Sequence, residues 1–200
     1  MPTTNGARAG PPDADDPRIF ERLPDRLTDN DSKKGIRADN ILGADLGNGG
    51  AFALVATSGD LLDVIDAPLL RDGPKGRPTI NAMLLATSLA KWRACRAFVE
   101  HVGPRPGEGS MSSFSFGRAR GIAEGIFATL AIPVTFITAP AWKRLIGIPP
   151  GRDGAKDAAR AAAIGRWPDK AALFARKCDD GRAEACLIAV AGLLREARRG

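Results

Sequence analysis

The order of short apolar segments along the chain is the feature that most limits its fold. Three strand-like segments come first, each bounded by glycine or polar residues, at 40–45, 51–56 and 61–67. The pattern then predicts a helix at 77–93, a strand at 96–102, a loop at 103–113, a helix at 116–130, a strand at 134–138 and helices within 140–200. This order predicts an α/β fold with a mixed five-stranded sheet flanked by helices on both faces.

Residues 1–38 differ in composition from the rest of the chain. They are rich in proline, glycine, aspartate and arginine and contain few large apolar side chains. We therefore expect a flexible N-terminal tail. Residues 39–200 are long enough for one domain, and we expect all of the ordered structure there.

The excess positive charge lies in the last third of the chain. Residues 141–200 contain 13 lysines and arginines against 7 aspartates and glutamates, whereas residues 1–38 and 39–140 are each neutral. A localised basic surface favours a polyanionic partner, usually nucleic acid. The alternative is a solvated cationic helix face.

Composition also argues against several classes of protein. No apolar run reaches the roughly 18 residues that span a bilayer, and the first residues have no apolar signal region, so we expect no membrane partner. Cys95, Cys178 and Cys186 lack the spacing of a zinc site or a disulfide framework. We expect reduced thiols in a cytoplasmic protein, in a bacterium or a phage-infected host.

Acidic residues stand out at two places on the predicted strands: Asp45 at the end of the first, and Glu100 within 96–102. Neither has a basic residue two positions away on its own strand, and an unpaired buried carboxylate is costly. A divalent cation such as Mg²⁺ is one partner that would satisfy both. Alternatively, Asp45 caps the glycine-rich turn that follows it, and Glu100 pairs with an arginine from elsewhere.

A third acidic cluster, at Asp179, Asp180 and Glu184, opens the last predicted helix. Asp180 and Glu184 are four residues apart and share one helix face. If they meet Asp45 and Glu100, four carboxylates repel one another unless cations neutralise them, as two ions about 3.5–4 Å apart do in nucleases. We expect these four residues to be catalytic ligands of two Mg²⁺ ions. Asp179 is an alternative to Asp180, and either is a candidate helix N-cap.

Five segments together resemble the RuvC-like Holliday junction resolvases, and specifically their phage and prophage branch. They are GADLGNGGAFALV (43–55), FVEHV (98–102), FGRARGIAEGIFATLAIPV (116–134), TAPAWKRLIGIPPGRDGAKDAARAAAIGRWP (138–168) and DDGRAEACLIAVAG (179–192). The resemblance implies a ribonuclease H-like fold. It also implies a homodimeric, Mg²⁺-dependent endonuclease, for which Mn²⁺ substitutes, that nicks a four-way DNA junction symmetrically during recombination and repair.

The resemblance carries over to particular residues. It implies that Asp45, Glu100, Asp180 and Glu184 are the metal ligands, with the closing pair at the phage-type spacing, because Gly181 stands three positions before Glu184 where cellular enzymes have an aspartate. Lys156 matches a family lysine near the site and is expected to stabilise charge in the transition state.

We expect several basic residues to contact DNA phosphates without reading sequence. They are Arg118, Lys143, Arg144, Lys156, Arg160 and Lys177. His101 is expected to be structural, with general-base catalysis as the alternative. The family places junction-entering residues at the loop 103–113, and Phe114 and Phe116 directly follow it, but core packing explains them equally well.

Three other functions fit parts of the pattern. A ribonuclease H acting on RNA–DNA hybrids and a non-catalytic junction-binding protein share the expected fold. The glycine-rich turn after Asp45 also suits the sugar kinase, actin and Hsp70 superfamily, but those proteins need a second lobe, and we expect about 160 ordered residues, too few for one.

Overall fold

A computed structural model describes residues 40–46, 49–71, 78–103, 107, 109–149 and 155–198, and the statements below concern these residues. The chain divides into two units, Met1–Ile36 and Arg37–Gly200, and the described residues all belong to the second. The N-terminal tail predicted at 1–38 lies outside the described residues and stays a prediction. The side chains of Ala155 and Lys156 lie outside the description as well.

The second unit is built on a five-stranded mixed sheet, as predicted. Its strands run in the spatial order β3-β2-β1-β6-β7. The bounds are β1 Ile41–Asp45, β2 Ala51–Val55, β3 Leu61–Asp66, β6 Arg96–His101 and β7 Val134–Thr138. β1, β2 and β3 form an antiparallel meander, whereas β6 lies parallel to both β1 and β7.

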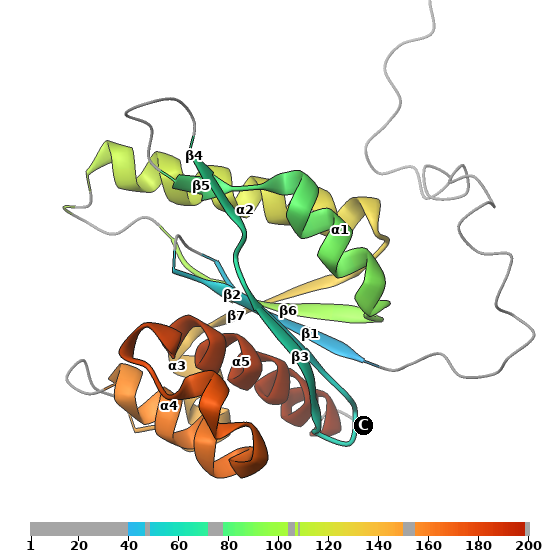
Figure 1. Ribbon diagram of the computed structural model, residues 1–200, viewed down its shortest axis with the longest axis vertical. Helices are drawn as coiled ribbons and strands as arrows, with labels where there is room; N and C mark the ends of the chain where they lie inside the picture. Colours follow the sequence, from blue (N-terminus) through green and yellow to red (C-terminus); the bar gives the residue numbers. More distant parts are fainter. Residues whose placement is uncertain are drawn as a thin grey trace, which may run out of the picture. The chain divides into compact units, whose positions relative to one another are not determined.

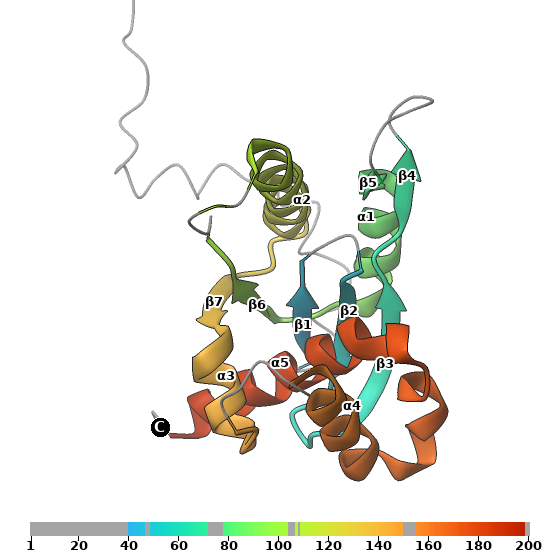
Figure 2. The same ribbon diagram turned by 90° about the vertical axis from the view of Figure 1, so that its left-hand side faces the viewer.

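Helices cover both faces of this sheet (Figures 1 and 2). One face carries α1 (Ala82–Trp92) and α2 (Ser110–Thr129), and the other carries α3 (Ala139–Ile146), α4 (Ala155–Arg166) and α5 (Asp180–Ala197). Two short 3₁₀ helices, η3 (Pro168–Phe174) and η4 (Lys177–Asp179), join α4 to α5. Each face has its own core, because successive strand residues point to opposite sides: Ile41 packs with α5 and Leu42 packs with α1 and α2.

Two element boundaries differ from the sequence prediction. Residues 78–80, predicted as the start of a helix, form strand β5 (Pro78–Ile80), which pairs with β4 (Leu69–Arg71), and α1 starts only after the N-cap Asn81. The β-branched Thr79 and Ile80 are buried in this hairpin, so tertiary packing outweighs the helical spacing. Helix α2 also begins inside the predicted loop, at Ser110, since no proline occurs between residue 106 and Pro133.

Helix α5 lies unusually close to the sheet. A Cβ atom placed on Gly43 of β1 would lie 2.0 Å from the carbonyl oxygen of Ala185, and one placed on Gly192 would lie 2.1 Å from the Phe98 ring. The absence of side chains at these glycines lets the helix backbone pack directly on β1 and β6. The acidic start of α5 is thereby held against the ends of those two strands.

The described helices include none with the length and apolar character that crossing a membrane requires. All three cysteines are free thiols, with Cys186 buried, Cys95 half-buried and Cys178 exposed. Burial raises the pKa of the Cys186 thiol far above its usual range, so this side chain packs as a small apolar group.

Candidate metal centre

Asp45 and Glu100 meet because β1 and β6 are parallel neighbours. The register aligns Gly43 of β1 with Phe98 of β6, so two residues later Asp45 comes to lie beside Glu100. Side chains two positions apart in a strand share a face. Since Gly43 and Phe98 both pack on α5, the two carboxylates face that helix as well.

Glu184 completes the cluster from the second turn of α5. One carboxylate oxygen from each of Asp45, Glu100 and Glu184 lies within 4.8 Å of the others. All three residues are half-buried, and the Glu184 side chain is only 16% exposed. The structure therefore brings together three of the four residues predicted as metal ligands, from two strands and one helix.

Asp180, the fourth predicted ligand, is the first residue of α5. Among the described residues, the group of three carboxylates does not include it. Its role as a ligand stays a prediction.

Helix α3 adds two residues to the cluster. It begins directly after β7, beside Glu100 on β6. Trp142 is fully buried and its Nε1 donates a hydrogen bond to Glu100 Oε2 at 3.2 Å. Lys143 places its Nζ 3.4 Å from Glu184 Oε1 and 5.0 Å from the centre of the Trp142 ring. Lys143 was predicted to contact DNA. The contact of Trp142 with Glu100 was not predicted, because its only signal in the sequence is its place next to that lysine.

The donor set fits a hard divalent cation. Mg²⁺ prefers carboxylate and water oxygens at about 2.0–2.1 Å, so two of its ligands lie up to about 4.2 Å apart. Only opposite ligands of an octahedral ion reach that distance, and adjacent ligands lie about 3 Å apart. The oxygens of Asp45, Glu100 and Glu184, which lie within 4.8 Å of one another, would therefore close by up to about 1.8 Å around an ion. Lys143 places one positive charge beside Glu184. The mutual repulsion of three carboxylates favours a cation among them.

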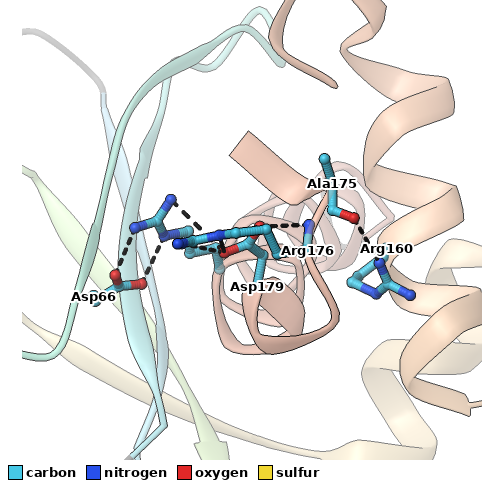
Figure 3. Close-up of polar contacts among 6 residues, drawn as sticks. Asp66, Arg160, Ala175, Arg176 and Asp179 are labelled. Carbon is cyan, nitrogen blue, oxygen red and sulfur yellow. Dashed lines mark hydrogen bonds and ion pairs between the residues drawn. The ribbon is translucent and has the colours of Figure 1, made fainter. Parts of the chain in front are cut away.

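Asp179 has a structural role at the junction between η4 and α5 (Figure 3). Its side chain is 2% exposed. It accepts hydrogen bonds from the backbone nitrogen of Arg176 at 2.8 Å and from Nε and Nη2 of the same residue at 3.1 and 2.8 Å. The Arg176 hydrogen bonds hold the pKa of the Asp179 carboxyl below its usual range. Asp179 thus closes the turn that precedes α5, as the third residue of η4 in a capping box with Arg176. It stands at the N-cap position of α5 but makes no side-chain capping hydrogen bond to that helix.

A second ion pair ties the same end of α5 to the sheet. Arg182 donates to both carboxylate oxygens of Asp66 at the end of β3, from Nε at 2.6 Å and from Nη2 at 2.5 Å. Figure 3 shows Asp66 and Asp179 as neighbours in this network. A bidentate pair of this kind fixes both distance and orientation. It holds the helix turn between Asp179 and Glu184 in place.

The predicted DNA contacts divide into two groups. Arg144 on α3, Lys177 on η4 and Arg118 on α2 are exposed. Arg160 instead pairs with Asp157 and donates to the carbonyl oxygen of Ala175 at 3.3 Å, and its side chain is 17% exposed. The bond to Ala175 fastens α4 to the segment before η4 (Figure 3). The Lys156 side chain lies outside the described residues.

The remaining candidates lie near the α2 side of the sheet. His101 is exposed at the end of β6, and its ring meets the edge of Phe136 with the centroids 6.0 Å apart, a packing contact. Phe116 packs against the core under α1 and α2, whereas Phe114 is 72% exposed. Core packing therefore explains Phe116 and not Phe114.

Comparison with solved structures shows which known fold this chain shares. No protein-family model matches the sequence, and a search of functionally described proteins gives no match. Among solved structures, RuvC of Thermus thermophilus matches with a TM-score of 0.56 and 16% identity, over 80% of this chain and 96% of that one. The same protein in complex with a Holliday junction substrate matches with a TM-score of 0.53 and 18% identity, at the same coverage.

At these identities the likeness concerns the fold. The mixed sheet and its helices are those of the ribonuclease H-like class of α/β proteins. Within that class the chain has the RuvC fold, as the resemblance in the sequence implied.

Proposed function

We propose that this protein is a structure-selective endonuclease that resolves four-way or otherwise branched DNA by metal-dependent hydrolysis of phosphodiester bonds. The observation that carries the proposal is the cluster of Asp45, Glu100 and Glu184 at the strand ends of a RuvC fold, with a lysine beside it. Acidic residues from separate elements converge there although they repel one another, which is typical of a site that binds cations.

In this proposal Asp45, Glu100 and Glu184 hold Mg²⁺, or Mn²⁺ in its place, and Asp180 contributes to a second ion. The bound cations supply Lewis-acid stabilisation of the charge that develops on the phosphate. Lys143 neutralises Glu184 in the free protein and lies close enough to contact a phosphate at the site. Lys156 on α4 is proposed to add positive charge to the same region.

The proposed DNA partner is supported by charge and by the structural neighbour. The neighbour is a RuvC bound to a Holliday junction substrate. Here the exposed Arg144 and Lys177 lie on α3 and η4, elements that flank the acidic cluster, and suit phosphate contacts on either side of it. Arg118 is proposed as a further contact, on the α2 side.

We also propose that the protein acts as a homodimer, because paired nicks need two active sites. Among the described residues, most large apolar side chains that are exposed belong to β4, α1 and α2, on one side of the sheet. They are Leu69, Leu70, Met83, Leu84, Met111 and Phe114. A second copy of the chain would bury them and leave the acidic cluster, which faces α5, open to DNA. Light scattering of the purified protein tests this, and a monomer at working concentrations contradicts it.

The proposed activity is tested with three substrates of matched sequence in Mg²⁺: a synthetic four-way junction, a linear duplex and an RNA–DNA hybrid. The proposal predicts paired nicks in the junction, at least about tenfold faster than any cleavage of the duplex. Preferred cleavage of the RNA strand in the hybrid would indicate a ribonuclease H instead. Junction binding without cleavage would indicate a non-catalytic junction-binding protein.

A further inference from the structure

The three tryptophans of this chain offer a natural comparison. All are buried, and each donates its indole N–H to one acceptor: Trp92 to Asp63 Oδ2 at 2.9 Å, Trp142 to Glu100 Oε2 at 3.2 Å and Trp167 to the carbonyl oxygen of Gly59 at 3.1 Å. Only the acceptor of Trp142 belongs to the acidic cluster. A buried indole N–H normally finds a partner, so the bond alone would mean little. The choice of partner is what distinguishes Trp142.

We propose that Trp142 is a positioning residue that fixes the Glu100 carboxylate for metal binding and thereby sets the affinity of the cluster for a divalent cation. The inference rests on the proposed function, since it presupposes that the cluster binds a metal. Trp142 itself would contact neither metal nor DNA.

The neutrality of the indole donor is the first argument. A carboxylate has two oxygens and about four acceptor positions, so the bond to Oε2 leaves capacity for a cation. A lysine or arginine at this place would orient Glu100 equally well, but its charge would oppose the metal. Trp142 orients the carboxylate and preserves its full negative charge.

The rigidity of the donor is the second argument. The Trp142 side chain has 0% exposure and packs in the core formed by β1, β6 and α3 to α5. Helix α3 follows β7 without a loop, and Ile137 of β7 is the register partner of Glu100. The donor and its acceptor are therefore fixed to the same pair of neighbouring strands. Hydrogen bonds of this kind to a ligand typically change metal affinity 10- to 100-fold when they are removed.

The test is Mn²⁺ binding measured by calorimetry, with no DNA and no turnover. Trp142→Phe keeps an aromatic ring in the core and removes only the N–H donor. We expect its Kd for Mn²⁺ to rise about tenfold. The matched control is Trp92→Phe, which removes an indole bond to a carboxylate outside the cluster and should leave the Kd within about twofold of wild type.

A double variant shows whether Trp142 acts through Glu100. In a Glu100→Gln background, Trp142→Phe should cause no further loss of affinity, because the group it orients has gone. An unchanged Kd in Trp142→Phe overturns the inference, and so does an equal loss with and without Glu100. If the wild-type protein binds no Mn²⁺, the proposed function itself is contradicted.

Nuclear magnetic resonance of the wild-type protein provides a second test that does not depend on the stability of a variant. Each tryptophan gives one indole N–H signal. Titration with Mg²⁺ should shift the indole N–H signal of Trp142, because its acceptor Glu100 would bind the cation. The signal of Trp92 should stay in place, because its acceptor Asp63 lies outside the cluster. A Trp142 signal that does not respond while calorimetry shows binding overturns the inference.

Discussion

Gly181 lies directly against the backbone of Gly49, so closely that a Cβ atom on Gly181 would stand 2.1 Å from the Gly49 carbonyl oxygen. At this point the first turn of α5 touches the segment between β1 and β2 through main-chain atoms. Asp45 precedes this contact on one side and Glu184 follows it on the other. The contact sets how closely two of the three carboxylates can approach.

The first prediction concerns that contact. Gly181→Ala forces the helix away from the strand ends, because the atom it meets is backbone and cannot rotate aside. We expect a loss of about 1–3 kcal/mol in the free energy of unfolding, and weaker Mn²⁺ binding. Gly117→Ala on α2 is the control, since nothing lies within 4 Å of its added Cβ, and it should be neutral or stabilising by up to about 1 kcal/mol. Urea unfolding measures the free energy of unfolding of both variants. A Gly181→Ala protein as stable as wild type would contradict this prediction.

The second prediction concerns Asp179 and acid. Its folded-state pKa lies below the ordinary value of 3.8, so its ion pair with Arg176 stabilises the fold fully above about pH 4–5. That contribution is lost as the pH falls through the lowered folded-state pKa. Asp179→Asn should therefore cost about 1–3 kcal/mol at pH 7, and the difference from wild type should shrink at lower pH. Unfolding curves between pH 7 and pH 3 test this, and a difference that grows toward low pH has the wrong sign.

The third prediction concerns Lys143, which lies 3.4 Å from Glu184. Lys143→Gln removes a positive charge beside the metal ligands, so Mn²⁺ should bind a few-fold more tightly. Junction DNA should bind more weakly, with the salt dependence of its binding constant reduced by about one unit, because one phosphate contact is gone. Calorimetry and binding titrations at several salt concentrations measure the two effects. A variant that binds both partners as wild type does shows that Lys143 serves only packing.

The fourth prediction concerns Asp180, which the group of three carboxylates does not include. If Asp180 helps to hold a second ion, Asp180→Asn should lower the number of bound Mn²⁺ ions from two to one and leave the tighter site nearly unchanged. Glu184→Gln should weaken the tighter site itself. Electron paramagnetic resonance measures the number of Mn²⁺ ions bound per protein and so distinguishes the two variants. An Asp180→Asn protein that still binds two ions would show that Asp180 is not a ligand.

The fold was largely predictable from sequence because its strands are short, apolar and separated by clear turn signals. The prediction of β7 at 134–138 matches Val134–Thr138 throughout. The hairpin of β4 and β5 was missed because Pro78, Thr79 and Ile80 run straight into a helical pattern. Only their pairing with Leu69–Arg71 reveals the strand.

The site was predictable in part for a similar reason. Asp45 and Glu100 stand out because carboxylates are rare on buried strands, and Glu184 because it opens an apolar helix.

Other features of the site depend on tertiary contacts. Whether Asp179 or Asp180 joins the three carboxylates depends on where α5 starts, and the hydrogen bonds from Arg176 to Asp179 fix that start. The Trp142 bond to Glu100 joins residues 42 positions apart and has no local signal. The DNA contact of Arg160 stays a prediction, and its bond to the carbonyl oxygen of Ala175 depends on how α4 packs and has no local signal.

The central claim is that Asp45, Glu100 and Glu184 form a metal-dependent nuclease site. The most direct measurement compares junction cleavage and junction binding for Asp45→Asn, Glu100→Gln and Glu184→Gln. Glu124→Gln is the matched control, because Glu124 is a half-buried α2 residue outside the acidic cluster that pairs with Arg120. We predict that the three variants lose at least about 100-fold in Mg²⁺-dependent cleavage while they bind the junction as tightly as wild type, and that the control keeps both activities. Equal cleavage by wild type and all three variants would contradict the account.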